Sequence, residues 1–267
     1  MKINHQIFGL VILMTFVLIG CGSDNQDSKI NINTSADSLT ASEKIIPDGL
    51  ILHLDASDSK SYSGTGLIWK DLSGQGNDGK LINAPIFNKE GVKSFKVTSG
   101  SKIDINAENL KIDAGTWSIW FKTANENDDF SEIMTLATQN ESLSNGGHIY
   151  IGKSHAYFAA KNSGNNFITK NNDFGMVVND SWHNLVLTYK KNDRCIGYLD
   201  GKEAFSTNLP NWQWTSSKVM RICGRWSKWS KADEFSGNVA QVNIYSRTLT
   251  STEVLKNFET FKKRFNL

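Results

Sequence analysis

Alternation of apolar and polar side chains is the feature of this chain that most restricts its fold. In residues 116–123, Trp117, Ile119 and Phe121 occupy every second position, and residues 182–190 repeat the pattern. Successive side chains of a β-strand point to opposite faces, so each segment predicts a strand with one face in a core. Helical spacing is almost absent outside the last twenty residues. The chain is therefore predicted to be all-β.

Turn signals and length indicate how these strands are arranged. Asp200-Gly201 separates two strand-like runs and predicts a hairpin, because a type I′ turn needs positive φ at its centre. The chain contains only three prolines, so few strands are interrupted. About 220 residues follow the polar N-terminal region, which is enough for one large sandwich. We expect two packed antiparallel sheets.

The C-terminus is the exception to the strand pattern. Thr250 and Glu253 form a capping box, in which each side chain accepts a backbone N–H of the first turn. Apolar residues follow at helical spacing, namely Val254, Leu255, Phe258 and Phe261. Basic residues suited to a helix C-terminus come next, namely Lys262, Lys263 and Arg264. A short terminal helix is predicted to lay its apolar stripe on the sandwich.

The N-terminus predicts export and lipid anchoring. Residues 7–20 are uncharged and apolar but too short to span a bilayer comfortably, which is typical of a secretory signal. The sequence Leu18-Ile19-Gly20-Cys21 resembles a bacterial lipobox. That resemblance implies removal of residues 1–20 and acylation of Cys21. The protein would then be extracytoplasmic, lipid-anchored to a bacterial membrane at the periplasmic or cell-surface side. An ordinary signal peptide with an incidental cysteine is the alternative.

The remaining chain divides into a stalk and a domain. Residues 21–44 are polar and cannot bury enough surface to offset their ordering entropy, so they are predicted to be a flexible stalk. Residues 45–267 form the folded domain. The net charge of +2 argues against broad electrostatic capture of nucleic acid. Cys195 and Cys223 can form a disulfide in an oxidising compartment, or remain two buried free thiols.

Several stretches resemble the LamG-like jelly rolls of the concanavalin A-like lectin/glucanase superfamily. They are the sequences GLILHLDAS at 49–57, WKDLSGQGNDG at 69–79, GTWSIWF at 115–121, WHNLVLTY at 182–189 leading to YLDG at 198–201, and FSGNVAQVNIYSRTL at 235–249. The resemblance implies a concanavalin A-like jelly roll over nearly the whole domain. Function does not follow equally, because this fold carries lectins, adhesins, enzymes and scaffolding modules.

The resemblance also implies a calcium ion near the strand ends, as a candidate cofactor. Calcium prefers oxygen ligands, and residues 71–79 supply Asp71, Asn77 and Asp78. Gln241 stands where many relatives place an acidic residue, and this departure weakens the site. In the alternative, Asp71 and Asn77 only brace a glycine-rich turn by local hydrogen bonds.

No residue pattern indicates catalysis. Glycosidases need two closely placed carboxyl groups, and the nearest match, Glu126, Asp128 and Glu132, is too widely spaced and is interpreted as a solvated acidic loop. The histidines show no metal-binding spacing, and His148 and His155 flank a predicted hairpin. There is no Gly-x-Ser-x-Gly nucleophile elbow. We expect a protein that is not an enzyme.

Tryptophans give the best indication of a ligand site. Four are expected in the core, namely Trp69, Trp117, Trp120 and Trp182. Others lie in polar segments without core alternation, and the candidate ligand-binding residues are Trp212, Trp214, Arg225, Trp226 and Trp229. A flat ring can cover the apolar face of a sugar while polar neighbours bond its hydroxyls. Alternatively, these tryptophans cap the open end of the sandwich.

These observations favour a membrane-anchored, carbohydrate-binding module, with calcium as a candidate cofactor. Its partner would be a glycan or a cell-surface polysaccharide. The second hypothesis is an adhesive or structural domain that binds another protein through the same tryptophans.

Overall fold

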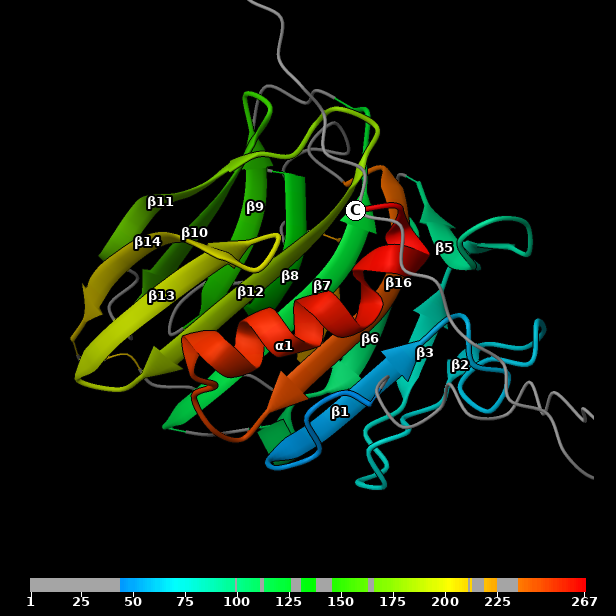
Figure 1. Ribbon diagram of the computed structural model, residues 1–267, viewed down its shortest axis with the longest axis horizontal. Helices are drawn as coiled ribbons and strands as arrows, with labels where there is room; N and C mark the ends of the chain where they lie inside the picture. The colour runs from blue at the N-terminus through cyan, green and yellow to red at the C-terminus, as the bar shows by residue number, and fades with distance from the viewer. Residues whose placement is uncertain are drawn as a thin grey trace, which may run out of the picture. The chain divides into compact units, whose positions relative to one another are not determined.

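Two antiparallel sheets of eight strands each pack face to face in the computed structural model of this protein (Figure 1). The structure describes residues 44–98, 100–110, 113–125, 131–137, 146–162, 166–210, 212, 219–224 and 235–267. The predicted all-β sandwich with a short C-terminal helix is confirmed over these residues.

The first sheet, sheet A, has the strand order β14-β13-β12-β7-β16-β5-β4. Its remaining strand, β1, pairs with β16 beyond the short β5. The strands of sheet A are β1 (Leu50–Asp55), β4 (Ile86–Asn88), β5 (Ser94–Val97), β7 (Ala114–Lys122), β12 (Trp182–Lys190), β13 (Asp193–Leu199), β14 (Lys202–Leu209) and β16 (Gly237–Tyr245).

The second sheet, sheet B, has the order β11-β10-β9-β8-β15-β6-β3-β2. Its strands are β2 (Ile68–Trp69), β3 (Gly79–Ile82), β6 (Lys102–Asn106), β8 (Ser131–Ala137), β9 (Gly147–Gly152), β10 (His155–Lys161), β11 (Phe167–Met176) and β15 (Val219–Ile222). A short 3₁₀ helix, η1 (Glu108–Leu110), follows β6. The helical C-terminus consists of α1 (Ser251–Phe261) and η2 (Lys262–Phe265).

The core lies between the sheets and is built by the alternation seen in the sequence. Trp117 and Ile119 of β7 belong to the same buried cluster as Ile149 of β9 and Phe158 of β10. All four side chains are fully excluded from solvent. Every second residue of a strand thus contributes to one continuous apolar layer.

The predicted hairpin joins β13 to β14. Asp200 and Gly201 both have positive φ, at 50° and 76°, as a type I′ turn requires. Gly201 has a second role, because a Cβ at this position would lie 2.9 Å from the ring of Phe258 in α1. The tip of the hairpin therefore fits directly beneath the helix.

The helix α1 lies across the outer face of sheet A (Figure 1). The predicted capping box between Thr250 and Glu253 is present, and the inward side chains of Val254 and Phe258 are buried. The ring of Trp120, in β7, stacks on Phe265 with centroids 3.9 Å apart. Trp120 is buried as expected, but under the helix rather than in the core between the sheets.

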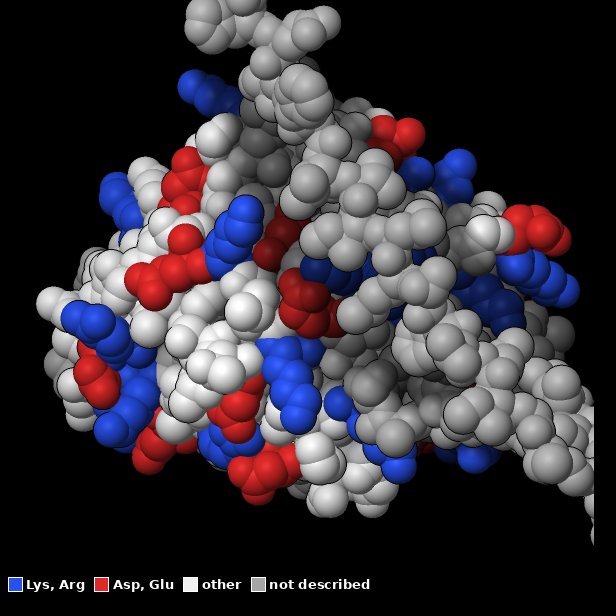
Figure 2. All heavy atoms as spheres, viewed as in Figure 1, with Lys and Arg blue, Asp and Glu red and all other residues white. Residues whose placement is uncertain are grey.

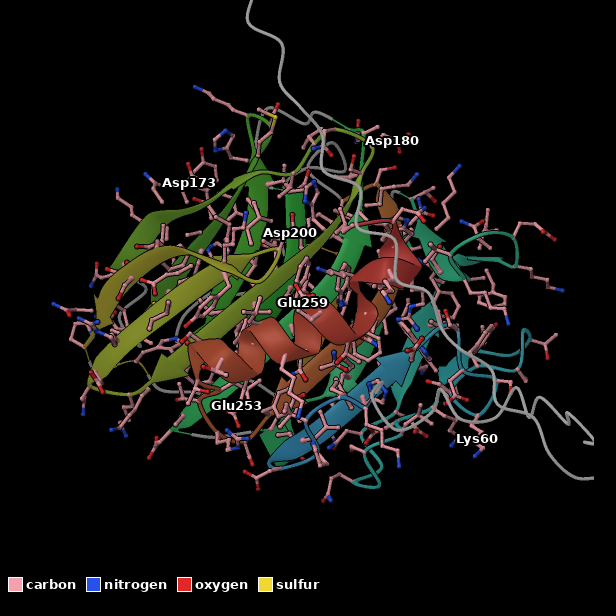
Figure 3. All side chains as sticks on the ribbon, viewed as in Figure 1. Lys60, Asp173, Asp180, Asp200, Glu253 and Glu259 are labelled. Carbon is pink, nitrogen blue, oxygen red and sulfur yellow. The ribbon has the colours of Figure 1, made fainter. Side chains whose placement is uncertain are left out.

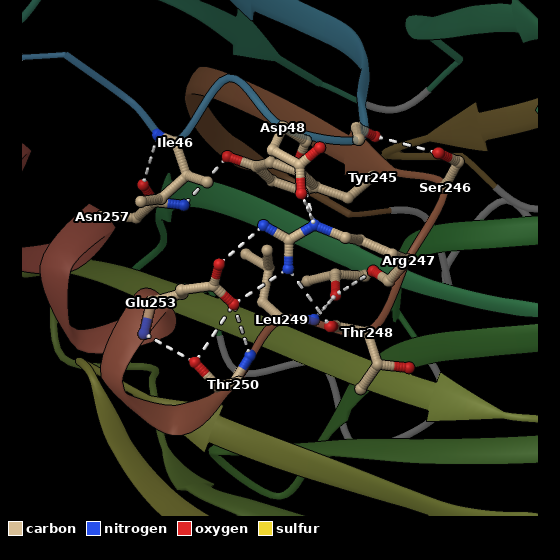
Figure 4. A network of polar contacts seen from close by, with 12 residues as sticks. Ile46, Asp48, Tyr245, Ser246, Arg247, Thr248, Leu249, Thr250, Glu253 and Asn257 are labelled. Carbon is tan, nitrogen blue, oxygen red and sulfur yellow. Dashed lines mark hydrogen bonds and ion pairs between the residues drawn. The ribbon is translucent and has the colours of Figure 1, made fainter.

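A polar network ties the start of the domain to this helix (Figure 4). Arg247 donates to both carboxylate oxygens of Glu253, at 2.9 and 2.6 Å, and pairs with Asp48 at 2.7 Å. Ile46 N donates to Asn257 Oδ1 at 2.9 Å. The hydrogen bonds from Arg247 lower the pKa of Glu253 to about 2. The helix is thus held at its first turn by charge as well as by its apolar stripe.

The two cysteines are free and buried, so the predicted disulfide between Cys195 and Cys223 is wrong in this structure. Cys195 lies in β13 of sheet A, whereas Cys223 follows β15 of sheet B. Burial raises the pKa of Cys195 to about 12 and also raises the pKa of Cys223. Both are therefore neutral, apolar core side chains, which is the alternative that the sequence left open.

The side of the molecule that carries α1 shows basic and acidic side chains interspersed rather than gathered by sign (Figure 2). This agrees with the small net charge. Across the described residues, no helix has the length and apolar character needed to cross a membrane. Residues 1–43, including Cys21, lie outside the described residues, so the signal, anchor and stalk stay predictions.

Candidate functional site

The outer face of sheet B carries a repeated His-x-Tyr pattern. His148-Ile-Tyr150 lies in β9 and His155-Ala-Tyr157 lies in β10. The two strands pair antiparallel, with Tyr157 opposite Tyr150. Ile149 belongs to the core, so the histidine and tyrosine on either side of it point outward.

These four side chains form a row, which we call the aromatic row: His148, Tyr150, Tyr157 and His155. Successive ring centroids lie 5.1, 5.6 and 6.2 Å apart. The two tyrosine planes differ by only 29°, and the planes of Tyr157 and His155 by 21°. His148 and Tyr150 are each 5% exposed, whereas Tyr157 and His155 are partly exposed. The row is thus buried at one end and partly exposed at the other.

Strand β11 supplies polar partners along the open edge of the row. Tyr150 Oη donates to Asn171 Oδ1 at 3.1 Å. His155 Nδ1 lies 3.0 and 2.9 Å from the two carboxylate oxygens of Asp173, which is labelled in Figure 3. Amide and carboxylate oxygens therefore lie beside rings that a ligand can reach.

A buried carboxylate lies at the closed end of the row. Glu132 of β8 is 2% exposed, accepts a hydrogen bond from Thr135 Oγ1 at 2.7 Å, and lies 3.4 Å from His148 Nδ1. Glu132 lies in strand β8 and is paired with Tyr150 of β9, whereas Glu126 and Asp128 of the predicted acidic loop lie outside the described residues. Within the described residues, His148 Nε2 is buried and makes no hydrogen bond.

Burial determines the ionisation of the row. It raises the pKa of Tyr150 to about 12, with the neighbouring Tyr157 adding to the effect. Burial and the charge of Asp173 raise the pKa of Tyr157. Both tyrosines are therefore neutral phenols near pH 7, and each hydroxyl can donate and accept hydrogen bonds. Lys161, further along β10, has its pKa lowered by burial, against the opposing effect of Glu132.

The other half of this face is charged rather than aromatic. Arg221 of β15 makes a bidentate pair with Asp104 of β6, at 2.7 and 2.9 Å. A depression of about 540 Å³ adjoins this pair. Its lining residues are Asp78, Lys80, Ile82, Asp104, Ile105, Asn106, Glu108 and Val219. No aromatic ring is among these lining residues, so this depression offers a ligand no ring to stack on.

The predicted tryptophan site is only partly within the described residues. Trp212 is 3% exposed, and its ring packs against Tyr189 and Trp117 with centroids 4.8 and 5.9 Å apart. Gly147 makes room for it, because a Cβ there would lie 2.6 Å from Trp212 Cζ2. The ligand-binding assignment of Trp212 is therefore wrong, and its alternative as a core cap is right. Four residues lie outside the described residues and stay predictions, namely Trp214, Arg225, Trp226 and Trp229.

Both oxygens of the Asp71 carboxylate, which was predicted to bind calcium, accept hydrogen bonds from the protein itself. Its Oδ1 accepts from the backbone N–H groups of His53 and Ser73, both at 2.9 Å. Its Oδ2 accepts from Ser73 Oγ at 2.7 Å and from the backbone N–H of Asn77 at 3.0 Å. Both lone pairs of each oxygen are thus directed at protein donors, as the turn-bracing alternative requires.

Asp78, Gln241 and Asn77 also make hydrogen bonds within the protein, and Asn77 Nδ2 donates to the backbone carbonyl of Ile51 at 2.7 Å. Asp78 Oδ1 accepts a backbone N–H of the same loop, and its Oδ2 pairs with Lys70 at 2.6 Å. Gln241 donates to Asp55 at 2.9 Å and accepts from Asn243 at 3.1 Å. In the part of the chain that the structure describes, no cluster of three or more His, Cys, Asp or Glu side chains could hold a metal. These residues do not fit a calcium ion.

The aromatic row is not predicted by the sequence alone, in which His148 and His155 are recognised only as residues that flank a hairpin. The signal was present, because the same His-x-Tyr triplet occurs at positions 148 and 155. Seeing its meaning requires the register that puts Tyr150 opposite Tyr157.

Comparison with known proteins agrees with this architecture. A family model described as the concanavalin A-like lectin/glucanases superfamily matches residues 97–255. No curated protein matches the sequence.

Several solved structures share the fold. The binding domain of Paraclostridial Mosquitocidal Protein 1 has a TM-score of 0.62 and 17% identity, over 80% of this chain and 53% of that chain. A structure of botulinum neurotoxin type C, whose cell entry depends on two ganglioside molecules, has a TM-score of 0.62 and 15% identity, over 80% and 52% of the two chains. The binding domain of botulinum neurotoxin DC in complex with rat synaptotagmin II has a TM-score of 0.61 and 16% identity, with the same coverage. This chain thus spans about half the length of these structures, and identities this low show the fold alone.

Proposed function

The chain belongs to the concanavalin A-like lectin/glucanase superfamily, and we propose that it is a binding module that takes a glycan on the aromatic row of sheet B. The observation that carries the proposal is the stepped burial of the four rings. Tyr157 and His155 are partly exposed to solvent, while Tyr150, which packs against Tyr157, and His148 are buried. A sugar can stack its C–H face on such rings and bond its hydroxyls to polar groups at their edge.

The polar neighbours suit hydroxyl groups better than a single ionic ligand. Asn171 and Asp173 supply oxygen acceptors, and the neutral phenols of Tyr150 and Tyr157 can donate or accept. Lys161 Nζ lies 4.6 Å from the centroid of the Phe167 ring, so a cation borders the row without occupying it. Acceptors, donors and flat apolar faces together match the surface of a saccharide.

The fold is compatible with this role and with a competing one. One similar neurotoxin interacts with two ganglioside molecules, and another was solved with rat synaptotagmin II. Glycan and protein are thus both partner classes found for domains of this architecture. We favour the glycan because the partly exposed rings of Tyr157 and His155 lie beside the carboxylate oxygens of Asp173. We propose binding without catalysis, since similar structures are described as binding domains.

A glycan array with purified protein tests this proposal. Tyr157→Ala should weaken binding about tenfold or more, equivalent to roughly 1.4 kcal/mol, because it removes the most accessible tyrosine ring. Tyr157→Phe should retain most of the affinity, since the ring remains. Leu255→Ala, an exposed change on the opposite side of the sandwich, is the matched control and should bind like the wild type.

The predicted tryptophan site is tested in the same experiment. If the Trp226→Ala/Trp229→Ala variant lost glycan binding while Tyr157→Ala bound like the wild type, the glycan site would be assigned to those tryptophans instead. Silence across the array, with Tyr157-dependent capture of a protein partner, would instead support the adhesive hypothesis. Wild-type binding by Tyr157→Ala in either assay would refute a role for the aromatic row.

We also propose that Cys21 carries a lipid that tethers the module outside the cytoplasm of a bacterium. The lipobox-like sequence at residues 18–21 supports this proposal. Metabolic labelling with a fatty-acid probe should mark the wild-type protein and not Cys21→Ser. Labelling that persists in Cys21→Ser would contradict the anchor.

A further inference from the structure

A second hollow lies at β1, at an edge of sheet A rather than on the face that bears the aromatic row. Its volume is about 430 Å³. The first residues of the domain, the turn after residue 71 and the end of α1 surround it. Its apolar walls include Ile45, Leu50, Leu72 and Phe261, and His53 and Asp58 are among its polar groups. Apolar walls with a few polar groups are typical of small-molecule pockets of this size.

A chain of buried amides fixes the orientation of His53 in this pocket. Gln241 Nε2 donates to Asp55 Oδ2 at 2.9 Å, and Asn243 Nδ2 donates to Gln241 Oε1 at 3.1 Å. Asn243 Oδ1 then lies 2.6 Å from His53 Nδ1. Asp55, Gln241 and Asn243 are 5%, 0% and 3% exposed, so water cannot substitute for these bonds.

The direction of the chain is set by its first member. Asp55 also accepts two hydrogen bonds from Arg264 Nη1, at 3.1 and 2.8 Å, and one from the backbone N–H of Ser57. An ionised carboxylate is only an acceptor, so Gln241 must present its NH₂ group to it. The carbonyl of Gln241 then takes the NH₂ of Asn243, and the carbonyl of Asn243 is left to face His53.

The consequence is a defined tautomer of His53. Because Nδ1 faces a carbonyl oxygen, it must be the protonated nitrogen, and neutral His53 has its lone pair on Nε2. Within the described ranges, no backbone or side-chain group bonds to this Nε2, and it is not among the buried atoms without a partner. His53 Nε2 is thus a solvent-accessible acceptor, and the hydrogen bond from Nδ1 to Asn243 fixes the position of the ring.

The charges around the pocket cancel. Asp55 is paired with Arg264, and the remaining charged groups of the lining, Lys44 and Asp58, have opposite signs. An ionic ligand would gain little from such surroundings. A hydroxyl group can donate to His53 Nε2 while a saturated ring lies against Ile45, Leu50 and Phe261.

We propose that this pocket is a second binding site, for a small uncharged alcohol whose hydroxyl donates to His53 Nε2 and whose apolar ring fills the hollow. The site is independent of the aromatic row, since it lies on other strands and uses other residues.

Cyclohexanol and methoxycyclohexane form a matched pair of probes, because the ether keeps the ring but lacks the hydroxyl donor. Long-range ¹H–¹⁵N spectra of the full chain should first show His53 as the Nδ1–H tautomer. Adding cyclohexanol should then move the His53 Nε2 resonance, while His155 on sheet B stays unchanged. The ether should bind about tenfold or more weakly, because it leaves the acceptor unpaired.

Variants separate this site from the proposed glycan site. His53→Phe keeps a ring and removes the acceptor, so it should lose the preference for alcohol over ether. Tyr157→Ala should respond to cyclohexanol as the wild type does, so the failure of one site would not count against the other. An Nε2–H tautomer, a resonance unmoved up to the solubility limit of cyclohexanol, or equal responses to alcohol and ether would each overturn the proposal. These readings need only the wild-type protein, so they hold even if His53→Phe does not fold.

Discussion

The outer faces of the two sheets differ far more than their inner faces do. On the inner side, both sheets present the same kind of apolar side chain to one core. On the outer side, sheet A presents Trp120, Val186 and Tyr198, which are buried together with side chains of α1 and the segment before it. Sheet B instead presents rings with polar partners, such as Tyr150 and Tyr157.

This difference shows how one architecture separates stability from recognition. An apolar outer face must be shielded from water. On sheet A the shield belongs to the same chain, because α1 is the element that follows β16. A face of rings and polar groups can meet solvent, and its partly exposed rings, Tyr157 and His155, remain available to a ligand. Changes on sheet A should therefore affect folding, and changes at the aromatic row should affect binding.

The largest expected effect tests the outer face of sheet A, which α1 covers; we call it the sealed face, and we call the outer face of sheet B the open face. Trp120→Ala removes a ring that stacks on Phe265 and Phe258, with centroids 3.9 and 5.6 Å away. We expect a loss of about 3–5 kcal/mol in the free energy of unfolding, because a large buried side chain leaves a cavity. Urea denaturation followed by fluorescence or circular dichroism measures it.

The matched change on the open face is Tyr157→Ala. Its ring is only partly buried, so the loss in unfolding free energy should stay near 1 kcal/mol or below, even though ligand binding falls. If Tyr157→Ala destabilised the protein as much as Trp120→Ala does, the open face would contribute as much to stability as the sealed face.

The second effect concerns the charged half of sheet B. Asp104→Asn leaves the guanidinium of Arg221, which is 9% exposed, without its bidentate carboxylate. We expect a loss of about 2 kcal/mol, since charge-assisted hydrogen bonds are among the stronger ones. A double-mutant cycle with Arg221→Met in urea isolates the pair. A coupling energy near zero would show that the Arg221–Asp104 pair does not stabilise the fold.

The third effect concerns the first turn of α1, the helix that covers sheet A. Arg247 lowers the pKa of Glu253 from its ordinary 4.5 to about 2, so the folded state favours the ionised carboxyl. The resulting stability is complete above about pH 4.5 and is lost as the pH falls toward 2. We expect the loss to be roughly 1 kcal/mol, because both side chains are about a quarter exposed. Glu253→Gln should flatten this part of the stability curve, and an unchanged slope in that variant would assign the acid sensitivity to other groups.

How far the sequence predicts this molecule depends on the kind of information needed. Local signals were sufficient for the hairpin at Asp200-Gly201 and for the capping box at Thr250 and Glu253, because each is complete within a few residues. Alternation was sufficient for the sandwich. It could not tell an inner face from a covered outer face, so Trp120 was expected in the core.

The errors at the candidate sites have the same origin. Trp212 lies in a polar segment and looked exposed, but Gly147, far away in the sequence, leaves space for its ring. The sequence also did not predict the contact of Glu132 with His148, which the pairing of β8 with β9 brings together. Both outcomes depend on contacts between distant strands, which a single sequence does not state.

The smallest expected effect concerns calcium, where we expect no change at all. A metal bound only by the folded state would stabilise it by about 2.7 kcal/mol at a hundredfold excess over its dissociation constant, and the melting temperature would rise. The oxygens of Asp71 and Asp78 already accept hydrogen bonds, so binding an ion there would first have to break them. Melting curves with calcium and with a chelator should therefore coincide. If calcium raised the melting temperature and Asp71→Asn removed the rise, the loop at residues 71–79 would have to rearrange around the ion, and this edge of the sandwich would join the open face as a site of recognition.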